Sequence, residues 1–476
     1  MRKLITIWFM AVSMVYGFSV SANAKEKPGT AKKRNVIFFI SDDLNVDIGC
    51  YGHPQVRTPN LDKFRNQAVV FDHAYVQYPM CNASRISFLT GSYPTRNRTY
   101  GNNEYLRDNM PEAVTLPELF KKNGYKTISS GKVFHCTDPQ SWTEISDLRT
   151  GGVLPEGRPR EFYWPPYEDE EACVGEGRNL TEDKEGYLKW MEWRSVTKKE
   201  ELLFDAMVEK AVVNRIEELA ESSDPFFMAV GFRRPHDPYY APKRYFDMYP
   251  LDSIQVPLTP EDASHIPDIA FGNWKKIFDQ LNEQDTREFI CSYYAGISYM
   301  DEQFGMLLDL MQEKGLLDNT LIVFAGDNGF LPGDKGWFNK GVLFERACQV
   351  PLMISHSGMD RAGERCERVV EFVDVFPTIT ELCGIENPTD QLDGTSLVPL
   401  LRDSESDWNE LAHTWYGYDR SIRDQRYRYI KWSETDDALY DHKNDKGEFY
   451  NLVENPEYAE LVKRMRKELE NLPKRE

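Results

Sequence analysis

The sequence predicts an α/β protein in which helices cover both faces of a large mixed, mostly parallel sheet and a smaller antiparallel unit follows. Short runs of β-branched and aromatic residues alternate with segments of helical periodicity. These runs are apolar throughout, as is typical of strands buried on both faces. Beyond Gly394 the runs become shorter and mix polar with aromatic residues, which indicates the antiparallel unit.

Each element rests on its own pattern. The strands of the large sheet are expected at residues 35–40, 125–129, 225–231, 321–325 and 351–355. Helical periodicity occurs at residues 201–221, 287–313 and 375–383. In the C-terminal unit we expect strands at 414–417, 427–432 and 448–452, and a charged helix from about Pro456. The Gly-, Pro- and acid-rich stretch 150–193 is interpreted as a long surface excursion.

The N-terminus has the pattern of a secretory signal peptide over residues 1–24. Arg2 and Lys3 precede an apolar run, and Ala22-Asn23-Ala24 is typical of a cleavage site. Because the run is short for a membrane span, we expect a secreted chain with no stable span, in a bacterial periplasm or outside the cell. Residues 25–395 would form a catalytic domain, and residues 396–476 a C-terminal subdomain with a small sheet and a helix.

Charge and cysteine content exclude some classes. The 476 residues include 57 Lys and Arg against 77 Asp and Glu, a formal net charge of −20, which disfavours nucleic acid as a partner. The eight cysteines show neither C-x-x-C nor zinc-finger spacing, so no disulfide scaffold or zinc cluster is indicated, and disulfide pairing is left open.

Chemically useful residues follow four of the predicted strands, where ligands bind in α/β sheets. They are, in chain order, Asp42, Asp43, Lys132, His135, His236, Asp327 and Asn328. The carboxylates and the amide among them make an all-oxygen ligand set that favours Ca²⁺ before Mg²⁺. For Asp42 and Asp43 alone, helix capping would be the favoured explanation, but the Gly-Asp-Asn-Gly segment after a second strand favours a metal.

The most specific motif spans residues 79–91, PMCNASRISFLTG, which contains Cys81 and Arg85. Its C-x-A-S-R core and the following L-T-G resemble the signature of the formylglycine-dependent sulfatases (type I sulfatases), closest to the iduronate 2-sulfatase-like enzymes. Ala83 stands where Pro is commoner. Further matching segments are Asp42-Asp43, GKVFH at 131–135, PFFMAVG at 225–231 with Pro235-His236, GDNG at 326–329 with Lys340, and GEFYNL at 447–452.

The resemblance implies an alkaline-phosphatase-like α/β sandwich and a modified residue at position 81. A maturation enzyme that generates formylglycine would oxidise Cys81 to 3-oxoalanine. The hydrated aldehyde carries two hydroxyls: one attacks sulfur, and the other later expels sulfate by re-forming the aldehyde. One Ca²⁺ per chain would be held by Asp42, Asp43, residue 81, Asp327 and Asn328.

The resemblance also assigns roles to the cationic residues. Arg85 would steady the hydrate, while Lys132 and Lys340 would bind the nonbridging sulfate oxygens. His135 would act as the base in sulfate release, and His236 as the acid that protonates the departing oxygen.

The expected substrate is a sulfated poly- or oligosaccharide such as a glycosaminoglycan, with a 2-O-sulfated, iduronate-like hexuronate as the reacting unit. Asn103, Arg107 and Trp337 are candidate sugar-subsite residues, and Arg107 suits a carboxylate. The sequon Asn82-Ala83-Ser84 lies inside the catalytic motif, where a glycan would block the pocket, which favours a bacterial source.

Several alternatives stay open. Sulfate esters of algal galactan or ulvan type would suit the same site almost as well. A phosphoester or phosphonate hydrolase of the same superfold is the enzymatic alternative, although it would call for a different nucleophile or more metal ligands. If Cys81 stayed a thiol, the chain would be a sulfated-glycan-binding protein.

Overall fold

The computed structural model describes residues 33–154, 170–409 and 411–472. The chain divides into Met1–Lys33 and a larger unit, Arg34–Glu476, which contains nearly all of the described residues. The signal peptide predicted over residues 1–24 lies outside the described residues. Within the described ranges, no helix has both the length and the apolar character needed to span a membrane.

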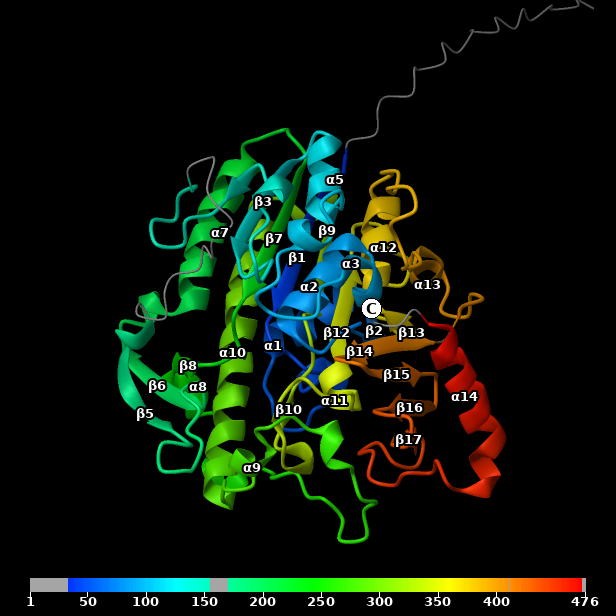
Figure 1. Cartoon of the computed structure of the whole chain (residues 1–476). Coiled ribbons are helices and arrows are strands. Elements are labelled where there is room, and N and C mark those ends of the chain that lie inside the picture. The colour runs from blue at the N-terminus through cyan, green and yellow to red at the C-terminus, as the bar shows by residue number, and fades with distance from the viewer. Residues whose placement is uncertain (1–32, 155–169, 410, 473–476) are drawn as a thin grey trace, which may run out of the picture. The chain divides into compact units, whose positions relative to one another are not determined.

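An eight-stranded sheet forms the centre of the larger unit (Figure 1). Its strands, in sheet order, are β13 (Arg365–Glu371), β2 (Val69–Tyr75), β12 (Gln349–Ser355), β9 (Thr320–Gly326), β1 (Asn35–Ser41), β7 (Phe226–Phe232), β3 (Lys126–Gly131) and β4 (Glu144–Ile145). β12 is antiparallel to both of its neighbours, and every other pair is parallel. The predicted fold class, a mixed and mostly parallel sheet in a sandwich, is confirmed.

Helices cover both faces of this sheet, because alternate side chains of each central strand point to opposite sides. From β1, Ile37 and Phe39 join the apolar core on one face, whereas Phe38 and Ile40 join the core on the other. The first face is covered by α1 (Pro59–Phe64), α7 (Phe204–Ala220) and α10 (Glu283–Glu313). The second is covered by α2 (Cys81–Thr90), α5 (Leu116–Lys122) and α12 (Val375–Leu382).

The C-terminal part forms the predicted antiparallel sheet, with α14 (Ala459–Asn471) packed against it (Figure 1). Its strands, in order, are β14 (Ala412–Tyr416), β15 (Asp419–Arg423), β16 (Tyr427–Lys431) and β17 (Asp437–Asp441). The strand predicted at 448–452 is wrong, because this segment is irregular and turns Glu448 into the interior. The domain boundary at residue 395 stays a prediction.

The predicted surface excursion at 150–193 contains regular structure. β5 (Val174–Asn179) pairs with β6 (Glu192–Lys198), and β6 lies parallel to β8 (Tyr239–Pro242), the strand that follows the loop after β7. Residues 155–169 of the excursion lie outside the described residues.

A buried ion-pair network joins the C-terminal sheet to the large-sheet region. Arg428 on β16 is fully buried and lies 2.5 Å from Glu345 Oε2 and 3.0 Å from Glu448 Oε1. His442 Nε2 lies 3.1 Å from Glu448 Oε1. Glu345, His442 and Glu448 are close enough together to hold a metal ion, but the arginine already occupies their oxygens, so we interpret the cluster as structural.

Replacing Arg428 with Ala is expected to lower the free energy of unfolding by about 3 kcal/mol, because two buried carboxylates would lose the cation they share and keep only Arg423 and His442 as ion-pair partners among the described residues. Arg464 on α14 provides the control: its 3.4 Å pair with Asp424 is exposed, so Arg464→Ala should cost less than about 1 kcal/mol. Urea unfolding of both variants measures the difference, and equal losses would contradict a structural role for the network.

Candidate active site

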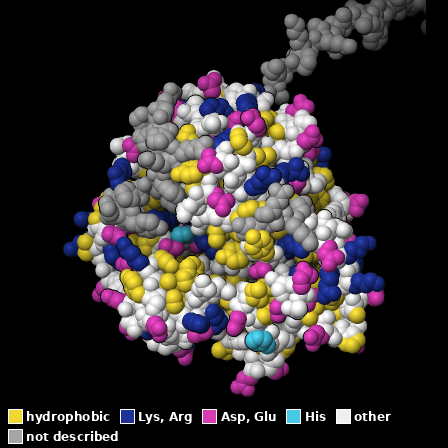
Figure 2. Space-filling model, viewed as in Figure 1, with side chains coloured by type: hydrophobic (Ala, Val, Ile, Leu, Met, Phe, Trp, Pro, Cys, Tyr) yellow, Lys and Arg dark blue, Asp and Glu magenta, His cyan; other side chains and the backbone are white. Residues whose placement is uncertain are grey.

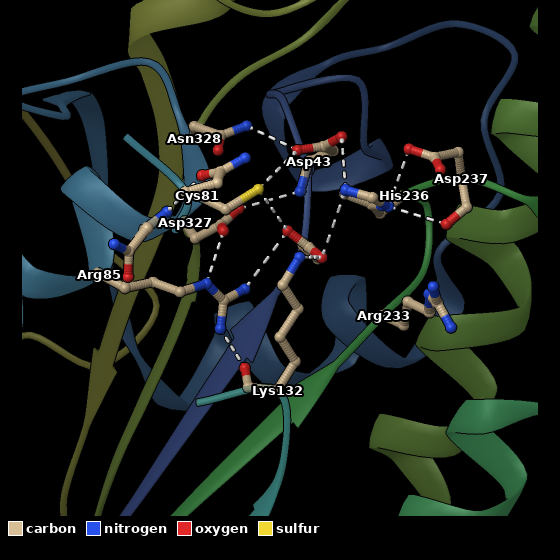
Figure 3. Close-up of polar contacts among 12 residues, drawn as sticks. Asp43, Cys81, Arg85, Lys132, Arg233, His236, Asp237, Asp327 and Asn328 are labelled. Atoms are coloured by element: carbon tan, nitrogen blue, oxygen red, sulfur yellow. Dashed lines mark hydrogen bonds and ion pairs between the residues drawn. The ribbon is translucent and has the colours of Figure 1, made fainter. Parts of the chain in front are cut away.

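The site lies at the carboxyl ends of the central strands, where backbone hydrogen bonds continue beyond the sheet. Asp42 N–H donates to Phe232 O at 3.2 Å, and Asp327 N–H donates to Ser41 O at 3.0 Å. Asp43 adopts a left-handed conformation (φ 60°), and its N–H donates to Asp327 Oδ1 at 3.0 Å. These bonds hold the three predicted carboxylates side by side. Figure 3 shows Asp43 and Asp327 beside Cys81.

Cys81 is the first residue of α2, a helix whose ten residues are all buried. Its Sγ lies 3.3 Å from Asp42 Oδ1, 3.8 Å from Asp43 Oδ1 and 2.8 Å from Lys340 Nζ. A helix N-terminus favours negative charge through its unpaired N–H groups. Residue 81 therefore lies at a buried helix N-terminus, between two carboxylates and the ammonium group of Lys340.

Burial, together with the nearby charge of Asp42, raises the pKa of the Cys81 thiol well above its usual value. The unmodified thiol is therefore protonated at neutral pH. Since the thiolate, not the thiol, is the reactive form, Cys81 as it stands is a weak nucleophile.

Three cations surround the carboxylates: Arg85 and Lys132 are buried, and Lys340 is half-buried. Arg85 Nε donates to Asp327 Oδ2 at 2.7 Å, and its Nη2 lies 3.5 Å from Asp42 Oδ1. Lys132 Nζ contacts Asp42, and Lys340 Nζ contacts Asp43. The formal charges of the three aspartates and of the three cations therefore cancel inside the site. On the molecular face in Figure 2, by contrast, acidic and basic side chains are interspersed.

Two glycines allow the segment that carries Lys132 to approach β7 closely. A Cβ on Gly231 would lie 2.0 Å from Lys132 O, and a Cβ on Gly131 would lie 2.2 Å from Gly231 O. Any larger residue would push the two strands apart. Gly131 also has a φ of +78°, a conformation that L side chains rarely adopt.

The pKa values of the two aspartates that follow β1, Asp42 and Asp43, are shifted in opposite directions. Burial alone would raise the pKa of Asp42, but the electrostatic effects of the neighbouring His236 and Lys132 outweigh it and hold this pKa well below its usual value. For Asp43, burial outweighs the opposing effect of Lys340, and its pKa is raised. Asp42 is therefore the carboxylate that is most firmly ionised.

The two predicted histidines lie among these charges. His236 Nε2 lies 3.9 Å from Asp42 Oδ2 and 3.9 Å from Asp43 Oδ2. His135 is half-buried, and burial together with the charge of Lys132 lowers its pKa to about 2. His135 is therefore neutral over the working pH range, the state that a proton acceptor needs.

Sequence reasoning missed the residues that fix the loop carrying His236. Asp205 on α7 accepts the N–H groups of Arg233 and Arg234 at 2.6 and 3.0 Å. The Arg234 side chain, 1% exposed, donates to Tyr240 O at 2.5 Å and to Glu170 Oε1 at 2.6 Å. The pair of arginines before the histidine was visible in the sequence, but their partners are distant along the chain.

The predicted oxygen ligands fit a divalent cation. Asn328 Nδ2 donates to Asp43 Oδ1 at 2.8 Å and to Gly329 O at 2.9 Å, which fixes the orientation of the amide. Its Oδ1 is buried and has no hydrogen-bond partner among the described residues, as expected of an atom that binds an ion. With the neighbouring carboxylates it offers the oxygen set that hard cations prefer.

Two of the three predicted sugar-subsite residues are not available to a sugar. Trp337 is 1% exposed, packs against Phe271 and Phe278, and donates to Lys340 O at 3.0 Å. It therefore supports the backbone of Lys340 instead of lining a subsite. Asn103 is exposed, and its role stays a prediction.

Arg107, the residue expected to bind a substrate carboxylate, is 8% exposed. Both carboxylate oxygens of Asp138 accept from it, at 2.6 and 3.1 Å, and Glu118 Oε2 accepts at 2.8 Å. Because its paired donors are already bound to protein carboxylates, the proposed carboxylate contact is corrected.

Comparison with known proteins decides the family. The family described as Sulfatase matches residues 34–385. The chain belongs to the type I sulfatase family. In this sulfatase, residues 333–475 also match the family described as N-sulphoglucosamine sulphohydrolase, C-terminal. As a sulfatase, the chain is a sulfuric ester hydrolase.

Relatives of known name are similar to this chain over most of its length. The sulfatase is 30% identical to a sulfatase of Formosa agariphila over 469 residues, covering 94% of this chain and 89% of the relative. It is 32% identical to iduronate 2-sulfatase of Mus musculus over 400 residues, covering 74% and 69%.

Solved structures share the fold at lower identity. One, bound to its substrate D-glucosamine-2-N,6-O-disulfate, superposes with a TM-score of 0.71 at 22% identity, covering 92% of this chain and 97% of that chain. The phosphonate monoester hydrolase of Agrobacterium radiobacter superposes with a TM-score of 0.73 at 22% identity, covering 92% and 95%.

Proposed function

We propose that this sulfatase removes sulfate from a sulfated poly- or oligosaccharide, with a 2-O-sulfated, iduronate-like hexuronate as the reacting unit. The observation that carries the proposal is the position of Cys81 at a buried helix N-terminus, beside carboxylates and cations. The similarity to iduronate 2-sulfatase supports the choice of sugar. The proposed enzyme is exported, so the purified mature chain should begin near Lys25, and one that still begins at Met1 would contradict export.

Formylglycine at position 81 and one Ca²⁺ complete the proposed site. Asp42, Asp43, Asp327 and Asn328, with residue 81, would hold the ion. The modified residue would supply the nucleophile, and the ion would acidify it and polarise a sulfate oxygen. A formylglycine-generating enzyme is the maturation partner that this proposal requires.

The protein's own residues handle the remaining charge and protons. Lys132 and Lys340 would bind the nonbridging sulfate oxygens, where charge shifts in the transition state. His236 faces the carboxylate cluster through Nε2 and would protonate the departing sugar oxygen, while neutral His135 would accept a proton when sulfate is released. Arg85 stays paired with Asp327 and keeps the nucleophile's surroundings fixed.

Sulfate release from defined saccharides tests the substrate. We expect fastest release from a 2-O-sulfated hexuronate disaccharide, slower release from galactose sulfates and ulvan oligosaccharides, and little turnover of an aryl phosphonate. Because the fold is shared with a phosphonate monoester hydrolase, aryl sulfate and aryl phosphonate with the same leaving group should be compared directly. Faster phosphonate turnover would overturn the assignment, and fastest release from an algal saccharide would replace the sugar.

A further inference from the structure

The imidazole of His236 contacts a further carboxylate, that of Asp237, on the side away from Asp42 and Asp43. Its Nδ1 lies 2.8 Å from the backbone oxygen of Asp237 and 3.1 Å from Asp237 Oδ1. Figure 3 shows the imidazole between Asp43 on one side and Asp237 on the other. Both groups at Nδ1 are acceptors, so Nδ1 carries a hydrogen, and Nε2 is the nitrogen that faces the site.

We propose that Asp237 is a positioning residue that holds the His236 ring so that Nε2 points at the oxygen leaving the sulfate ester. The inference rests on the acid role given to His236 in the proposed function. In that step the ester sulfur–oxygen bond breaks, and the sulfuryl group passes to the nucleophile at position 81. The bonding electrons stay on the departing oxygen, which takes a proton from Nε2 of the imidazolium form of His236; the ring then keeps its hydrogen on Nδ1.

The other contacts of this loop hold its backbone, so the orientation of the His236 ring depends on Asp237. Asp205 and the Arg234 side chain fix the backbone of the loop, as described above. Arg234 Nη1 also donates to His236 O at 3.2 Å. These contacts do not fix the rotation of the imidazole about its own bonds. A flipped ring would turn a C–H group toward both oxygens of Asp237 and lose the hydrogen bond to the carbonyl and the ion pair with the carboxylate, so the two oxygens together select one orientation.

A pair of aryl sulfates separates this role from a structural one. 4-Nitrophenyl sulfate has a good leaving group that needs little protonation, whereas phenyl sulfate has a poor one. For Asp237→Ala we expect phenyl sulfate turnover to fall by about 100-fold and 4-nitrophenyl sulfate turnover by about threefold, because a misdirected acid matters only when the leaving group needs a proton. Asp237→Asn keeps an oxygen that can accept from Nδ1 and should lose less on phenyl sulfate.

Asp247→Ala is the matched control, because this carboxylate is exposed and pairs only with Lys243 among the described residues; both rates should stay within about twofold. An equal fall on both substrates, or no fall, in Asp237→Ala would overturn the inference. His236→Ala is measured in parallel. If neither Asp237→Ala nor His236→Ala depends on the leaving group, the acid role in the proposed function fails as well. If His236→Ala depends on the leaving group and Asp237→Ala does not, only the role of Asp237 fails.

Discussion

The Cys81→Ala variant is expected to lose at least about 10⁴-fold in sulfate ester turnover while it keeps its fold. The large loss follows from removing the atom that becomes the nucleophile. The fold should survive because Sγ contacts carboxylates and an ammonium group, not the apolar core. Steady-state rates on 4-nitrophenyl sulfate and thermal unfolding measure the two effects.

Cys348→Ala is the matched control for this substitution. Cys348 is also fully buried, but it packs in the apolar core, and its Sγ faces Val342 O. We expect a modest loss of stability, of about 1 kcal/mol, with turnover unchanged. Mass analysis of the peptide that contains Cys81 completes the test: active enzyme should carry an aldehyde that resists thiol alkylation. An active enzyme that still carried a free thiol would contradict the proposed chemistry.

Chelation is expected to remove nearly all turnover, and Ca²⁺ should restore it better than Mg²⁺. The flexible, all-oxygen ligand set suits the larger ion, whereas Mg²⁺ prefers to keep several waters. Binding should also be visible without activity, because an ion held only by the folded chain raises the melting temperature. Unchanged turnover and an unchanged melting temperature after prolonged chelation would contradict a bound ion.

Asn328 gives the sharpest test of the ion site. Asn328→Leu keeps the size of the side chain but removes the unpaired oxygen, so we expect the Ca²⁺ concentration needed to raise the melting temperature to increase at least about tenfold. Asn328→Asp keeps an oxygen and should bind Ca²⁺ more tightly than the Leu variant. Equal Ca²⁺ responses of the two variants would show that this oxygen is not a ligand.

Two strands of the large sheet that the sequence did not predict, β2 and β13, contain polar residues. β2 contains Asp72 and His73, and β13, at the edge of the sheet, contains two arginines and two glutamates. A strand buried on both faces is apolar throughout and can be recognised alone. An edge strand, or a strand whose polar groups meet partners from distant segments, lacks this signal.

The sequence alone was enough to predict the positions of site residues that directly follow a strand. Asp42, His236 and Asp327 each follow a recognisable strand, and parallel strands bring their carboxyl ends to one edge. The motif at Cys81 could also be recognised from the sequence, because it is one short continuous segment, residues 79–91. The subsite predictions for Arg107 and Trp337 failed for the opposite reason. Whether Arg107 or Trp337 is free to meet a ligand depends on Asp138, Glu118 and Phe278, whose proximity the sequence does not reveal.

The sequence by itself therefore determined the fold class, the family and the chemical groups at the strand ends, because these follow from periodicity and from short motifs. Only the tertiary structure decided which side chains are already occupied and which atoms stay available. It paired Arg107 with Asp138, left Asn328 Oδ1 without a partner among the described residues, and placed Asp237 behind His236. Burial and hydrogen bonding between distant segments arise only once the chain has folded.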